Sequence, residues 1–179
     1  RSRKGDALLG GYKDIWIYDP PRQLTFSADV GLYSGLDTLP GEQNVSAGAG
    51  SLASTEIRVD YTNLAGSLGS VDHEQGYQTS LAMLGDFSRG EFFPKILGTF
   101  DFGFMLPWKH SSLWLYTSAG GGTGDRSSSL REFYFGSFGN NYVDDRAVKR
   151  YRDYESFPGF DIDALSARTF MKSVAEWNL

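Results

Sequence analysis

Apolar and polar residues alternate with a period of two along several stretches of the chain, which is the pattern of a β-strand with two different faces. The clearest case is 95–107. Aromatic residues dominate one parity of this stretch, whereas a charge and small residues share the other. The first set contains Ile96, Gly98, Phe100, Phe102, Phe104 and Leu106, and the second contains Leu97, Thr99, Asp101, Gly103 and Met105.

Residues 165–179 repeat the alternation over a longer span, with Leu165 and Trp177 on the apolar side and Lys172 and Glu176 opposite. At roughly 3.3 Å per residue this strand is about 50 Å long. A soluble strand usually has about 5–6 residues, whereas a tilted membrane strand needs about 9–11. An α-helix is the alternative here, because Ala, Met, Lys and Glu all favour helix.

Weaker alternation predicts further strands, giving roughly eight in all. They cover 12–18, 22–33, 54–62, 76–87, 112–120 and 131–138. Turn-rich stretches separate them, at 34–54, 65–75, 88–94, 120–129 and 139–163. Two of these loops exceed the length that is common in compact soluble domains. Outer-membrane barrels alternate long external loops with short periplasmic turns. We therefore predict an all-β fold, an antiparallel transmembrane β-barrel with meander strands.

Composition agrees with this fold and narrows the function. Aromatic residues make up 15% of the chain and there are 22 glycines, which favours strands over helices. The net charge of −5 argues against a nucleic-acid partner bound through a basic surface. The chain has no apolar run long enough for a transmembrane helix and no signal peptide. Because both ends interrupt recognisable patterns, we expect 1–179 to be part of a single barrel domain in a longer protein.

Candidate catalytic chemistry is sparse. The glycine-rich stretch 120–125 lacks the Gly-Lys-Ser/Thr ending of a phosphate loop, so a flexible hairpin loop is the favoured interpretation. His73 and His110 are isolated and polar in context, which makes them a poor zinc set and favours a surface or loop role. The carboxylate pairs Asp144–Asp145 and Asp161/Asp163 suit either cation binding or solvated loops. We predict no enzyme activity, no cofactor and no metal site.

A dense mixture of charged and aromatic residues at 149–155 precedes Phe157-Pro158-Gly159-Phe160, and 133–139 stands upstream with alternating aromatic and glycine residues. The order of these segments, followed by the long strand, resembles the barrel of the bacterial surface antigen superfamily, which includes the outer-membrane β-barrel assembly factor. The resemblance implies that 139–163 is a loop that tucks into the lumen, with Phe157 to Phe160 as its lumen motif.

In that family an arginine at the loop tip pairs with an acidic residue on a following strand. By position, Gly159 and Phe160 match the loop tip and Glu176 matches the strand acid, but Pro158 occupies the place of the arginine. Proline cannot form the charge-assisted hydrogen bond of such a pair. We therefore expect Arg150 or Arg152 to supply the cation that anchors the loop to Glu176.

The whole chain is similar to the barrel region of proteins that join a TolB-like periplasmic propeller to a barrel of this superfamily. Four stretches carry the similarity, at 10–14, 18–24, 138–144 and 157–160. The stretch 14–19 with 23–25 also resembles a propeller blade strand. The resemblance implies about 16 strands in total and a bacterial outer-membrane location. Its partners would be outer-membrane lipid, an unfolded or secreted polypeptide, and a periplasmic domain of the same chain.

Three functional hypotheses follow. The first is a protein insertion, translocation or secretion factor whose lumen is braced by 139–163. The second is a membrane anchor for a periplasmic propeller, without transport. The third is a soluble β-sandwich or lectin-like binding module, in which the apolar faces of two sheets would meet each other.

Overall fold

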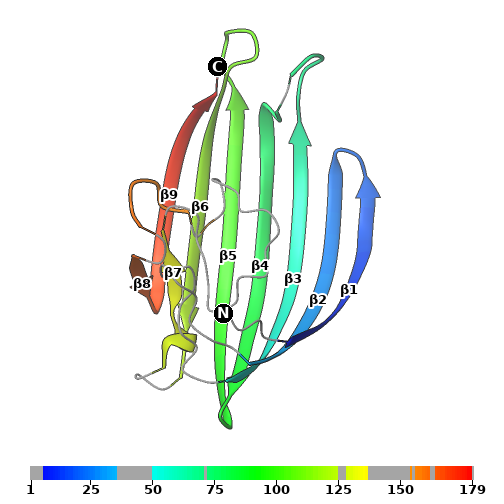
Figure 1. The fold of residues 1–179 in the computed structure, drawn as a ribbon. Helices are drawn as coiled ribbons and strands as arrows, with labels where there is room; N and C mark the ends of the chain where they lie inside the picture. The colour runs from blue at the N-terminus through cyan, green and yellow to red at the C-terminus, as the bar shows by residue number, and fades with distance from the viewer. Residues whose placement is uncertain are drawn as a thin grey trace.

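The computed structural model describes residues 6–35, 50–70, 72–124, 128–136, 154, 156–161 and 164–178. Most of them belong to one antiparallel sheet of seven strands, in the order β1-β2-β3-β4-β5-β6-β9 (Figure 1). The strands are β1 (Asp6–Asp19), β2 (Arg22–Ser34), β3 (Ser51–Ala65), β4 (Gln75–Ser88), β5 (Glu91–Met105), β6 (Ser112–Gly122) and β9 (Thr169–Asn178). The predicted all-β antiparallel meander is confirmed. The described strands form an open sheet, with β1 and β9 at its two edges.

A second, smaller unit lies against one face of the sheet. It consists of the 3-10 helix η2 (Ser129–Arg131) and a two-stranded sheet of β7 (Phe133–Phe135) and β8 (Leu165–Ala167). The predicted strand over 131–138 is confirmed only in part: Phe133–Phe135 form β7, which pairs with β8 in the second sheet, and Gly136 bridges Ser156. The prediction of a single strand over 165–179 also needs correction. The chain changes partner at Arg168, because β8 pairs with β7 whereas β9 pairs with β6.

Two other expectations of the sequence are also overturned. The helical alternative for 165–179 is wrong, since its described residues are extended. The glycine-rich stretch is not a hairpin loop at its start: Gly120 to Gly122 complete β6. A Cβ on Gly120 would lie 2.7 Å from the ring of Phe170, and one on Gly122 would lie 2.4 Å from the carbonyl oxygen of Arg131. Glycine is needed here because β9 and the second unit approach the strand closely.

The two faces of the large sheet differ sharply in charge. We call the face that the second unit covers the inner face, and the opposite one the outer face. The register places the charged residues of β3, β4, β5 and β9 on the inner face and none of them on the outer face. They are Glu56, Arg58, Asp60, Asp86, Glu91, Lys95, Asp101, Lys172 and Glu176. β1 and the start of β2 are exceptions: Asp14 lies opposite Phe26 on the outer face, and Asp6, Asp19 and Arg22 share its parity.

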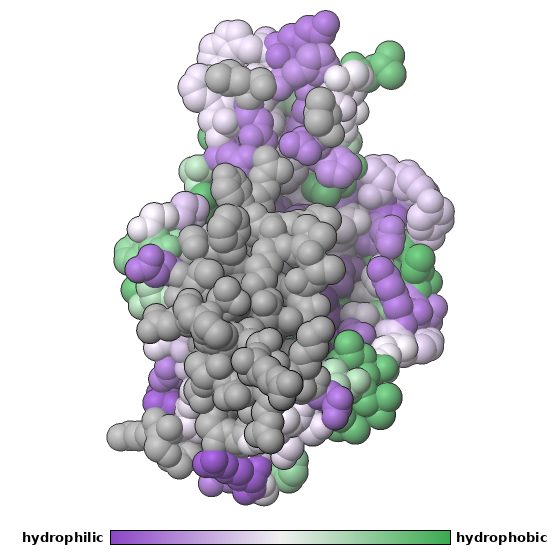
Figure 2. All heavy atoms as spheres, in the orientation of Figure 1, coloured by the Kyte–Doolittle hydropathy of each residue, from purple (hydrophilic) through white to green (hydrophobic). Residues whose placement is uncertain are grey.

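The buried apolar core lies on the inner side. The sheet contributes Leu52, Ala82, Phe93, Leu97 and Trp114, which all share the inner parity. Ala82 and Leu97 pack with Phe133 and Phe135 of β7. On the outer face, Phe100, Phe102 and Phe104 are 47%, 44% and 44% exposed. In Figure 2, which faces the covering residues, hydrophobic residues gather along the lateral margins and hydrophilic ones at the upper end.

Candidate functional site: the covered inner face

An aromatic cluster joins the second unit to the sheet. The ring of Phe170 on β9 meets Phe133 and Phe135 edge to face, with centroids 4.9 and 4.7 Å away. Tyr154 stacks on the same ring at 6.3 Å, nearly parallel to it. Aromatic pairs at these separations are stabilising beyond the area that they bury. The alternation of β9 places Phe170 on the inner face of the sheet. Its ring there contacts both β7 and Tyr154.

A buried ion pair lies below this cluster. Lys95 on β5 and Asp86 on β4 are 2.9 Å apart, and their side chains are only 5% and 3% exposed. The ammonium of Lys95 also lies 5.8 Å from the centre of the Phe133 ring. Removing two charges from water is costly, and their mutual attraction offsets this only when both remain. The pair therefore makes the inner wall dependent on two specific residues.

The segment around Ser156 is held by backbone and side-chain hydrogen bonds. The Phe157 N–H donates to the carbonyl of Gly136 at 2.5 Å, beside a parallel bridge between Gly136 and Ser156. Lys172 on β9 donates from Nζ to the carbonyl of Tyr154 at 3.1 Å and to the carbonyl of Ser156. Ser156 is almost completely buried. We call residues 128–136, 154 and 156–160 the covering segment.

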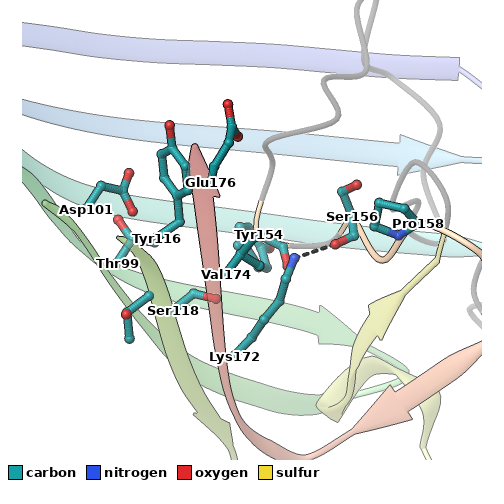
Figure 3. A pocket seen from close by; sticks show the side chains of 11 residues that line it. Thr99, Asp101, Tyr116, Ser118, Tyr154, Ser156, Pro158, Lys172, Val174 and Glu176 are labelled. Carbon is teal, nitrogen blue, oxygen red and sulfur yellow. Dashed lines mark hydrogen bonds between the residues drawn. The ribbon is translucent and has the colours of Figure 1, made fainter. Parts of the chain in front are cut away.

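A cavity of about 280 Å³ remains between the covering segment and the wall. The covering segment contributes Tyr154, Ser156 and Pro158, and the wall contributes side chains of β5, β6 and β9. Figure 3 shows that Tyr116 and Glu176 point the same way and that Asp101 lies beside Tyr116, whereas Lys172 reaches toward Ser156. One end of the cavity is thus acidic and the other is occupied by an amine.

The predicted lumen motif lies within the covering segment. Phe157 and Phe160 meet edge to face at 5.0 Å, and Gly159 between them has a φ of +94°. Such a φ favours glycine, so the short turn explains this position. Pro158 lines the cavity.

The predicted anchor pair has one described member. Glu176 lies on the inner face of β9 and lines the cavity. Arg150 and Arg152 lie outside the described residues, so their pairing with Glu176 stays a prediction. Lys172 and the Lys95–Asp86 pair were not predicted. The sequence does contain a signal for the Lys95–Asp86 pair. Two-residue turns fix hairpin register, and Ser88 pairs with Glu91 across Arg89-Gly90. That register sets Asp86 and Lys95 diagonally on one face.

A separate polar network lies at the opposite end of the strands. The buried Glu74 accepts a hydrogen bond from the Ser67 N–H at 2.6 Å, and its other oxygen lies 3.0 Å from Nδ1 of His110. Hydrogen bonds from the side chain and backbone of Ser67, with a smaller contribution from His110, hold the pKa of Glu74 below its usual value. Ser67 and Glu74 both contact His110, so this network links the β3–β4 and β5–β6 connections.

Searches for other site chemistry were negative in the part of the chain that the structure describes. There, His, Asp and Glu side chains do not gather in groups of three or more that could hold a metal ion. The same residues include no helix that is long and apolar enough to cross a membrane. Comparisons of the chain with protein-family models, curated proteins and solved structures find no match.

Proposed function

We propose that the large sheet is part of a transmembrane β-barrel of the bacterial outer membrane, with lipid against the outer face and the covering segment in the lumen. The observation that supports this best is the segregation of charge. Leu81, Met83 and Ile96 are each half-exposed or more on an outer face that lacks charge from β3 to β9. Soluble monomers rarely expose so extensive an apolar surface. A lipid-facing band explains it.

Strand length and aromatic positions support the same proposal. β3 to β5 have 14 or 15 residues each, beyond what a soluble strand needs. On the outer face of β5, Phe92 and Phe104 stand near its two ends. Twelve residues at about 3.3 Å and a tilt of about 35–45° separate them by about 30 Å along the barrel axis. This is close to the roughly 25 Å band that aromatic girdles flank.

We infer the orientation of the proposed barrel from its connections. The connections after β1, β3 and β5 lie toward the upper end in Figure 1, and the first of them has two residues. β2 and β6 end at the other end, where the 89–90 turn also lies, and the connections that follow them are much longer in sequence. Outer-membrane barrels keep short turns on the periplasmic side. The end that carries Glu74 and His110 then faces the periplasm.

The activity that we propose is insertion, translocation or secretion of polypeptide, as the resemblance to the surface antigen superfamily implies. The covering segment would brace the lumen, because its aromatic cluster and its contact with Lys172 fix it to the wall. The open edges at β1 and β9 would pair with further strands, since closure is what satisfies backbone groups in lipid.

Depth-dependent fluorescence quenching tests the membrane assignment. The chain has no cysteine, so single cysteines report without interference. A fluorophore on Phe100→Cys, in protein reconstituted in vesicles, should be quenched by spin-labelled lipid, and one on Thr99→Cys should be protected. Equal quenching at both positions would remove the membrane proposal. Folding of an added, unfolded outer-membrane polypeptide should then be faster in vesicles that contain the protein than in empty ones.

The packed inner side favours a second candidate, an anchor without transport. Ala82, Leu97, Phe133 and Phe135 pack together as a buried core on part of the inner face. Deleting 139–163 and recording conductance across a planar bilayer separates the two functions. A silent barrel that does not accelerate polypeptide folding favours the anchor.

A further inference from the structure

We propose that Lys172 is the latch that keeps the covering segment closed against the barrel wall, a proposal that rests on the barrel assignment above. An ammonium group has three donors and no acceptor. Two of them meet the carbonyls of Tyr154 and Ser156, which are two residues apart. One ammonium group therefore holds both carbonyls at once.

Burial makes these contacts consequential. Ser156 is only 1% exposed, and a buried carbonyl without a partner is costly. The N–H of the next residue, Phe157, donates to the carbonyl of Gly136. The amine of Lys172 supplies a charged partner to this buried carbonyl from the sheet.

Strand periodicity gives the latch a second contact. Phe170 and Lys172 are two residues apart on the inner face of β9, and both reach Tyr154, one through ring stacking and one through its carbonyl. Glu176 lies four residues further along, about 13 Å away by strand rise. The resemblance implies a cation on the loop and an acidic acceptor on the strand. In the latch the cation belongs to the strand β9, and the acceptors belong to the covering segment.

A buried reporter measures release of the segment. Ser156→Cys places a thiol where the folded protein excludes water, and its rate of maleimide labelling in vesicles reports opening. Adding Lys172→Met should raise that rate about tenfold to hundredfold, the effect of losing charge-assisted hydrogen bonds. Lys172→Arg, which keeps a cationic donor, should stay closer to the parent. Lys13→Met, which removes an exposed lysine from the same face, should leave the rate unchanged.

The outcomes separate the latch from the barrel assignment. A labelling rate within twofold of the parent in Lys172→Met, or an equal rise in Lys13→Met, overturns the latch. If Lys172→Met does not insert, Lys172→Gln is judged by the same criterion. Lipid quenching at Phe100→Cys is measured in the same vesicles. Loss of that quenching in the parent overturns the barrel itself, whereas retained quenching with unchanged labelling overturns the latch alone.

Discussion

The outer and inner faces of the sheet are made of the same strands, but their side chains differ in polarity and in what they contact. The outer face presents apolar side chains without neighbours to cover them, such as Leu81, Met83 and Phe100. The inner face carries the charges, and there each described contact is specific: Lys95 with Asp86, Lys172 with backbone carbonyls. Substitution on the outer face should therefore depend on polarity alone, whereas on the inner face it should depend on the partner.

The sharpest test of that contrast is Lys95→Met. It leaves the buried carboxylate of Asp86 without its cation, and breaking a buried pair typically costs about 3–5 kcal/mol. We expect a loss of this size in the free energy of unfolding, measured by denaturant titration in lipid vesicles. The double variant Lys95→Met with Asp86→Leu should recover most of it. A loss in the double variant equal to the sum of the two single-variant losses would show that the two charges act independently.

Placing the same charged residue on each face in turn also tests this contrast. Phe100→Arg puts a cation into the apolar band, which costs about 2–4 kcal/mol at the middle of a bilayer. Thr99→Arg, one residue away, places the same side chain in the inner cavity and should change the free energy of unfolding by about 1 kcal/mol or less. Equilibrium folding into vesicles measures both. The same cost at the two positions would mean that neither face meets lipid.

The sequence predicts the faces well, because they depend on local alternation. The alternation from Ile96 to Phe104 predicts which side of β5 is apolar, and the register of β4 and β6 extends that face. The boundaries were less accurate. β5 begins at Glu91 rather than 95, because the Arg89-Gly90 turn is shorter than its composition suggested. Both residues have positive φ, which suits a two-residue hairpin.

The inner contacts could not be read from local pattern, because they join distant parts of the chain. Lys172 meets Ser156 across 16 positions, and nothing near either residue in sequence specifies the contact. The separate pairing of Phe133 to Phe135 with β8 was hidden for the same reason: its alternation matches that of the large sheet. The tight space beside Gly120 is likewise created by Phe133 and Phe170, not by its neighbours in sequence.

Gly120 and Gly121 are adjacent in β6 and face opposite sides of the sheet, so they compare the inner and outer faces directly. A Cβ at 120 points inward and would lie 2.9 Å from Phe133, whereas one at 121 points outward and meets nothing nearer than Thr169 at 3.9 Å. Overpacking should make Gly120→Val about 1–3 kcal/mol less stable. Gly121→Val should be neutral or slightly stabilising, because valine favours strands. Thermal unfolding followed by electrophoretic mobility compares them; a larger loss at 121 would contradict the assignment of faces.

The smallest effect is expected at the end of the sheet where Glu74 joins two connections outside the strands. Because its folded-state pKa lies below the ordinary value, the ionised carboxylate stabilises the folded protein above that ordinary value. This contribution is lost as pH falls through the folded-state pKa. Glu74→Gln should therefore be less stable than the parent at neutral pH, and the two should converge in acid. Unfolding midpoints across that range measure the difference. A gap that stays constant at all pH values would mean that the charge of Glu74 contributes nothing, and that Ser67 and His110 need only a hydrogen-bond acceptor.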